Sequence, residues 1–165
     1  MARSRPALTR RRLRWSLVAG TGAVALVASA CSSSSSPSAG SSDPSPFRTH
    51  HTSFGTALTD ASGRSVYLFE ADTGTTSTCY TDCAGLWPPV TMSGSPTARP
   101  PVQGSLLGTT PRRDGGTQVT YAGHPLYYYA PDQGPGDAKG QGLQSFGAGW
   151  DLLKPSGEKV EGGGA

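Results

Sequence analysis

The sequence predicts an all-β fold: a small antiparallel β-sheet or sandwich built from two repeats, with one short helix and a disordered N-terminal tether. Glycine and proline are the first observation, because 23 Gly and 14 Pro among 165 residues are nearly twice the average share of about 12%, which argues against long helices. The second is an alternating pattern at residues 63–72 that recurs 60 positions later. The third is a serine- and proline-rich segment near the N-terminus, which cannot form a hydrophobic core.

The first 30 residues have the composition of a signal peptide of the lipoprotein type. Six arginines precede an uncharged run, Ser16–Ala30, and this run is shorter than the roughly 20 apolar residues of a spanning helix. It ends in small residues before Cys31, which resembles a bacterial lipobox, so we expect cleavage before Cys31 and lipidation of its thiol. Ordinary secretory cleavage after Ala30 stays open as the alternative, and Arg10–Arg12 also fit a twin-arginine export signal.

A tether of residues 31–46 follows the signal peptide. Residues 32–46 contain nine Ser and three Pro in fifteen positions, a composition that stays extended and solvated. We expect the lipid on Cys31 to anchor the protein at the extracytoplasmic face of the cell membrane, with the tether holding the domain off that surface. His50 and His51 are expected in the disordered end of the tether.

The predicted β domain, residues 47–165, is mildly acidic. Beyond the arginines of the first 30 residues, the sequence has eight basic and eleven acidic residues and no basic stripe. Nucleic acid is therefore excluded as a partner. The remaining 119 residues suffice for one β domain with a single core.

Two repeats fill this domain, repeat one at about 56–90 and repeat two at about 117–153. Gly63–Asp72 and Gly123–Asp132 align without a gap, and a short alternating run precedes each, so each repeat is predicted to form a hairpin. Side chains alternate along a strand, which would direct these residues of repeat one to opposite faces: Val66 and Leu68 to one, Tyr67 and Phe69 to the other. Because both faces are apolar, these strands are expected at the centre of the domain.

Three further elements complete the predicted fold. Thr78–Leu86 would form a short helix capped by Thr78. Ser105–Thr110 would form a strand that turns back through the Asp-Gly turn at residues 113–116. Trp87 and Trp150 would each lead the last strand of a repeat.

These motifs resemble a known family. The residues that carry the resemblance are Tyr67-x-Phe69-x-x-Asp72, Tyr127-x-Tyr129-x-x-Asp132, Cys79, Cys83 and Trp87-Pro88-Pro89. They are similar to predicted bacterial lipoproteins with a Y-x-[FWY]-x-x-D motif, secreted repeats of unknown function. The resemblance covers about residues 56–157 and implies an exported, usually lipidated two-repeat β module without an established activity.

The tyrosines and aspartates of the motif are predicted to form a structural corner that is used twice. A strand tyrosine buries its ring while its hydroxyl seeks a partner, and an aspartate at the strand end accepts hydrogen bonds from the N–H groups of its own turn. The alternative is a calcium site made of oxygen ligands. Its candidate ligands are Glu70, Asp72, Asp132 and Asp137.

Cys79 and Cys83 are the most chemically suggestive pair. With Cys31 assigned to lipid, the default for two cysteines of an exported protein is a disulfide. The alternatives are a reversible redox switch and a copper site with His124 or Met92 as a third ligand, since soft sulfur ligands suit Cu(I). No cofactor is expected, and copper at this pair is the alternative.

Enzymatic activity is not expected. The sequence lacks a nucleophile elbow, a metalloprotease motif, a P-loop and a dinucleotide fingerprint.

The Tyr127–Tyr129 run would pack in the core or offer a stacking surface for sugars or a protein. We therefore expect a lipid-anchored binding or structural module of the cell envelope with a protein or glycan partner, the alternative being a copper-binding or thiol redox protein.

Overall fold

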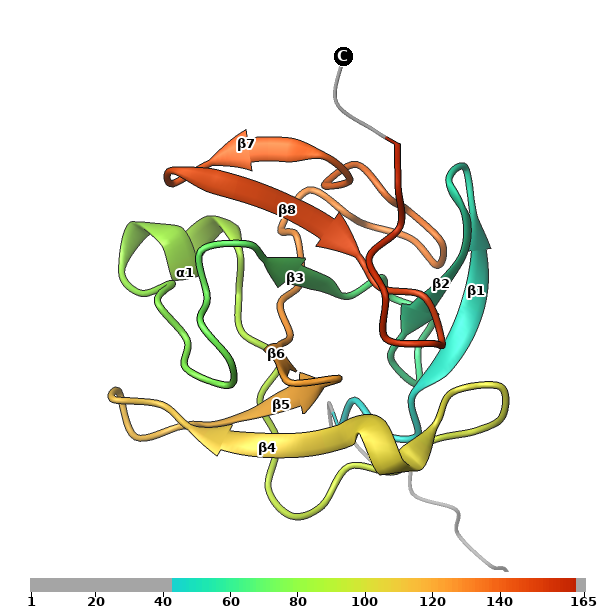
Figure 1. Ribbon diagram of the computed structural model, residues 1–165, viewed down its shortest axis with the longest axis horizontal. Helices are drawn as coiled ribbons and strands as arrows, with labels where there is room; N and C mark the ends of the chain where they lie inside the picture. The colour runs from blue at the N-terminus through green and yellow to red at the C-terminus, as the bar shows by residue number, and fades with distance from the viewer. Residues whose placement is uncertain (1–42, 163–165) are drawn as a thin grey trace, which may run out of the picture. The chain divides into compact units, whose positions relative to one another are not determined.

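The structure, a computed structural model, describes residues 43–162, in which short antiparallel strands are joined by long loops (Figure 1). The elements are β1 (Arg48–Thr52), β2 (Gly55–Thr59), β3 (Tyr67–Phe69), α1 (Asp82–Leu86), a 3-10 turn η1 (Gly104–Leu106), β4 (Leu107–Pro111), β5 (Thr117–Tyr121), β6 (His124–Pro125), β7 (Leu143–Ser145) and β8 (Ala148–Leu152). The all-β prediction is thus confirmed. The predicted signal peptide, Cys31 and most of the tether lie outside the described residues. Within residues 43–162 no helix has the length and apolar character needed to cross a membrane.

The strands form three small antiparallel sheets. β1 pairs with β2, β3 and β7 flank β8, and β4 and β6 flank β5. In Figure 1, β3 lies near the centre, between β8 and the β4–β5 hairpin. The predicted hairpin of repeat two is present as β5–β6, where Tyr121 pairs with His124 across a turn at Ala122 and Gly123. Both turn residues have positive φ, 49° and 86°, as this tight turn requires.

The two repeats meet at the centre through their motif tyrosines, Tyr67 and Tyr127. The Tyr67 N–H donates to the Tyr127 carbonyl oxygen at 2.8 Å, and the Tyr127 N–H donates to the Tyr67 carbonyl oxygen at 2.9 Å. Residues 65–69 are all buried. The expectation that these strands lie at the centre of the domain is therefore confirmed.

Side chains alternate between two core clusters on either side of this central pair. The first cluster contains Tyr67, Phe69, Trp87, Tyr127 and Trp150. The second contains Val66, Leu68, Val119, Tyr121 and Leu126. The division of repeat one into an aromatic face and an aliphatic face is the one that alternation along a strand predicts.

The folded domain begins earlier than the composition indicates. Phe47 is fully buried and Pro44 is also buried, so the end of the predicted tether packs on the domain. His50 and His51, predicted in the disordered end of the tether, lie in β1, where they pair with Ala57 and Thr56. Burial of the Phe47 side chain fixes the position at which this strand starts.

Three further local predictions were wrong. The hairpin of repeat one is reduced to an isolated bridge between Thr59 and Ser65, because β2 pairs with β1 and β3 pairs with β8. Trp87 leads no strand, because Pro88 and Pro89 follow it and a proline has no N–H for a ladder. The segment forms isolated bridges instead, from Pro89 to Tyr127 and from Thr91 to Gln118. The helix begins at Asp82, not near Thr78. Thr78 is not its cap, since the Thr78 N–H and hydroxyl both donate to Asp72 instead.

Candidate functional site

The motif tyrosines and aspartates pair across the repeats rather than within them. The Tyr67 hydroxyl donates to Oδ2 of Asp132 at 2.6 Å, and the Tyr127 hydroxyl donates to Oδ2 of Asp72 at 2.7 Å. All four side chains are buried. We call these two hydrogen bonds the reciprocal braces, because each repeat supplies the donor for the other repeat's acceptor.

The second oxygen of each aspartate holds its own loop. Oδ1 of Asp72 accepts from the Thr78 N–H at 2.7 Å and from the Thr78 hydroxyl at 2.6 Å. Oδ1 of Asp132 accepts from the Lys139 N–H at 3.0 Å. Each aspartate thus fastens its own loop to the tyrosine of the opposite repeat, which extends the predicted structural corner into a link between repeats.

The environment of the braces keeps both hydroxyls protonated. Burial, followed by the hydrogen bond to Asp132, raises the pKa of Tyr67 well above its usual range. Burial and the hydrogen bond to Asp72 raise the pKa of Tyr127 in the same way. Each phenol therefore remains a hydrogen-bond donor well above neutral pH, which suits a structural role.

Four aromatic rings stack where the two repeats meet, a junction that we call the seam. The Trp87 and Trp150 rings lie parallel, with centroids 3.9 Å apart and an interplanar angle of 4°. Phe69 stacks on Trp150 at 4.1 Å, and Tyr129 lies against Trp87 at 4.3 Å. Phe69 and Tyr129 are the second aromatic residues of the motif, and each contacts the tryptophan of the other repeat. The motif aromatics thus join the two repeats twice over.

The two cysteines form a disulfide, as predicted. Cys79 and Cys83 are bonded, with their Cα atoms 5.2 Å apart. Cys83 lies in α1, whereas Cys79 precedes the helix, so the bond fastens the incoming loop to the helix. Both cysteines are buried in the first core cluster, together with the stacked aromatic rings.

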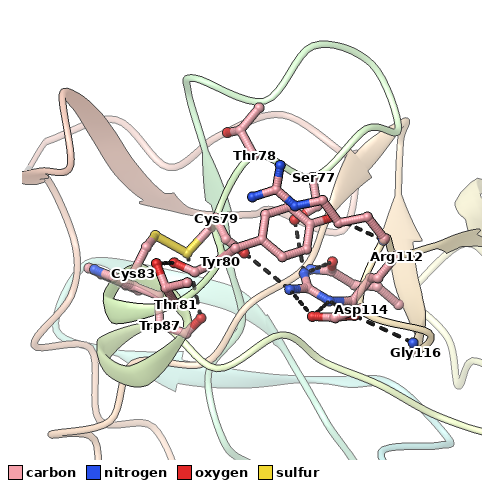
Figure 2. A network of polar contacts seen from close by, with 12 residues as sticks. Ser77, Thr78, Cys79, Tyr80, Thr81, Cys83, Trp87, Arg112, Asp114 and Gly116 are labelled. Carbon is pink, nitrogen blue, oxygen red and sulfur yellow. Dashed lines mark hydrogen bonds and ion pairs between the residues drawn. A yellow bond between two sulfur atoms is a disulfide. The ribbon is translucent and has the colours of Figure 1, made fainter.

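A buried arginine joins this disulfide loop to the β4–β5 hairpin (Figure 2). Arg112 Nη2 donates to the Cys79 carbonyl oxygen at 3.1 Å, and Nη1 donates to Ser77 Oγ at 2.9 Å and Gln118 Oε1 at 2.7 Å. Nε and Nη2 also donate to the Asp114 carboxylate. This hydrogen bonding lowers the pKa of Asp114. Every N–H of the guanidinium has a partner, which is what a buried arginine needs.

The structure disperses the residues considered for metals. Asp72 and Asp132 belong to the braces, Glu70 pairs with Lys159 at 2.7 Å, and Asp137 pairs with Lys139 at 2.9 Å. In the part of the chain that the structure describes, no group of three or more His, Cys, Asp or Glu side chains is arranged to hold a metal ion.

Within residues 43–162 the candidate copper ligands do not come together in a site either. The sulfurs of Cys79 and Cys83 are bonded to each other. Met92 packs against the second core cluster, whereas the cysteines lie in the first. His124 lies in β6.

Two features of the site were not predicted from the sequence. Arg112 gives only a weak local signal: it lies two positions after the buried Thr110 and so shares its inward face, whereas neighbouring Arg113 is exposed. The reciprocal pairing gives no local signal, because a tyrosine could pair with the aspartate of either repeat.

Comparison with known proteins agrees with this two-repeat architecture. A family model described as a secreted repeat of unknown function matches residues 48–91 and 108–154, together more than half of the chain. Neither the curated proteins nor the solved structures give a significant match.

Proposed function

Because this chain belongs to the family of secreted repeats of unknown function, it is an extracytoplasmic module, and we propose that it acts by binding or as a structural element rather than by catalysis. The observation that carries the proposal is the use of the motif side chains. Both tyrosines, both aspartates and the two tryptophans contact one another in the interior of the domain. The motif therefore supports a rigid scaffold, and its loops and surface are left to meet a partner, an envelope protein or a glycan.

The module is held at the membrane by a lipid on Cys31. The support is the run of small residues before Cys31 and the Ser/Pro-rich segment after it, which suits a spacer between membrane and domain. A lipid together with such a spacer leaves the domain accessible on the extracytoplasmic face.

Membrane fractionation tests the anchor. Cys31→Ala is expected to move the protein from the membrane fraction to the soluble fraction, whereas Ser32→Ala, a change at the next residue, leaves it in the membrane. Intact mass of the wild-type chain should show the added lipid. Unchanged membrane retention of Cys31→Ala would refute the anchor.

Intact mass under native conditions, with and without added Cu(I), tests the mode of action. The domain is expected to be two hydrogens lighter than its reduced mass, as the Cys79–Cys83 bond requires, and to carry no metal. A reduced pair that carries one copper would contradict the proposal and favour metal handling.

A further inference from the structure

Two surface hollows occupy positions that the repeat relates to each other. At the offset of 60, Arg64 corresponds to His124, and Tyr128 corresponds to Leu68. Arg64 and Tyr128 line a hollow of about 640 Å³, while His124 and Leu68 line one of about 380 Å³. Equivalent parts of the scaffold thus carry different side chains. Of the two, the hollow lined by Arg64 and Tyr128 is the better candidate for binding.

The Arg64 guanidinium has unused hydrogen-bond donors. Its Cζ lies 4.1 Å from the centroid of the Tyr128 ring, so the ring holds the guanidinium in place. Its only side-chain hydrogen bond among the described residues is a long one, from Nη2 to the Tyr129 carbonyl oxygen at 3.5 Å. Arg64 Nε is buried and has no partner within residues 43–162. Buried donors without partners are rare and costly. Because Nε is closed to solvent, a ligand in the hollow would be bound by Nη1 and Nη2, whose donors are unused within residues 43–162 apart from that one long bond.

The buried acid of the hollow is already satisfied. Oδ1 of Asp60 accepts from the Ser62 N–H and hydroxyl and from the Arg64 N–H, at 2.6–2.9 Å. Oδ2 accepts from the Tyr128 hydroxyl at 3.0 Å. Among the described side chains of the hollow, Arg64 therefore has free donors while both oxygens of Asp60 already have partners, which favours a ligand that brings acceptor oxygens.

The rest of the lining indicates a hydrophilic ligand. Besides Arg64, Tyr128 and Asp60 it consists of small residues and prolines, namely Ala61, Ser62, Thr91, Pro88 and Pro89, together with the exposed Asp43. Asp43 would repel a ligand of high negative charge, but its carboxylate can accept from hydroxyl groups. A ring with one carboxylate and several hydroxyls satisfies Arg64 and Asp43 together, which an acidic peptide side chain does not.

We propose that the hollow around Arg64 binds the carboxylate of an acidic saccharide. The planar guanidinium can donate two parallel hydrogen bonds to a carboxylate, and the sugar hydroxyls would reach Asp43 and Ser62. In the related hollow the basic group beside His124 is Lys159, which already pairs with Glu70 at 2.7 Å. The inference rests on the proposed binding role and names the chemistry of its ligand.

An NMR titration of the purified ¹⁵N-labelled chain tests the site, with the Arg64 Nε–H signal as the local probe. The ligands are a tetrasaccharide of glucuronic acid, a neutral tetrasaccharide of glucose and a tetrapeptide of glutamate. We expect saturable binding of the acidic saccharide with a shift of the Arg64 signal. Arg64→Gln should weaken binding at least about tenfold, and the matched variant His124→Gln should change it less than about twofold.

Fold integrity is controlled in the same samples. Because Arg64 covers Tyr128, thermal unfolding of each variant is measured, and Arg64→Lys, which keeps the charge over the ring, carries the test if Arg64→Gln unfolds. The lysine lacks the planar fork and should weaken binding at least about threefold.

Equal binding of the neutral saccharide or the peptide, unchanged affinity in the Arg64 variants, or no binding of any probe would overturn the inference. A chain that fractionates with membranes yet binds no saccharide would refute this site and leave the proposed anchor standing.

Discussion

The reciprocal braces predict energetic coupling between the two repeats. In Tyr127→Phe, Asp72 loses a donor at 2.7 Å but keeps its two hydrogen bonds from Thr78. A hydrogen bond to a charged partner contributes about 1.5–3 kcal/mol, so we expect the free energy of unfolding to fall by about 2 kcal/mol. For a domain of this size the thermal midpoint should then fall by about 8 °C.

Two further tyrosine variants bracket this result. Tyr67→Phe removes the equivalent donor to Asp132 and should cost a similar amount. Tyr80→Phe is the matched control, because among the described residues its hydroxyl only accepts from the N–H of exposed Arg113, at 3.3 Å. Its effect should stay below about 0.5 kcal/mol.

Double-mutant cycles by urea unfolding, with the disulfide intact, identify the partner. Tyr127→Phe combined with Asp72→Ala should give a coupling energy of about 1.5–3 kcal/mol. Tyr127→Phe combined with Asp132→Ala, the aspartate of its own repeat, should give less than about 0.5 kcal/mol. Coupling to Asp132 that equals or exceeds the coupling to Asp72 would refute the pairing across repeats.

Three other predictions concern the same seam. Gly140→Ala places a Cβ 2.8 Å from a buried Trp87 ring atom and should lower the free energy of unfolding in urea by about 1–3 kcal/mol. In the control Gly85→Ala, in α1, the added Cβ meets nothing within 4 Å, so this variant should be neutral or stabilising. Equal losses of stability in both variants would contradict the close contact at Gly140. Because the folded pKa of both motif tyrosines is raised above the unfolded value of about 10, their contribution is complete below pH 10 and is lost above it, by about 1.4 kcal/mol per pH unit for each tyrosine. Between pH 9 and 12 the free energy of unfolding, measured in urea, should fall less steeply with pH in each Phe variant than in the wild type. An unchanged slope would contradict the raised pKa of these tyrosines. Reduction of Cys79–Cys83, a five-residue loop, should lower the free energy of unfolding by about 2 kcal/mol, and an unchanged thermal midpoint with reductant would argue against this value.

Local features of the fold were predictable because the signals that specify them are local. Alternation along residues 66–69 assigns side chains to two faces, and the two core clusters follow that assignment. The Asp-Gly turn at residues 113–116 specifies the β4–β5 hairpin, and the absence of other cysteines after Cys31 specifies the disulfide. The helix start and the Trp87 segment were predicted wrongly, because Asp72 captures Thr78 and two prolines end the strand pattern.

The sequence by itself determined an exported two-repeat β module, because composition and a period of two residues are readable without knowing what lies nearby in space. Only the tertiary structure decided which aspartate each tyrosine binds, that His50 and His51 form an edge strand, and that Arg112 is buried while Arg113 is exposed. The two copies carry the same motif, so pairing within a repeat and pairing across repeats are equally consistent with the sequence. The antiparallel bridge between Tyr67 and Tyr127 brings the end of each strand to the other repeat's loop, and that long-range contact selects the reciprocal arrangement.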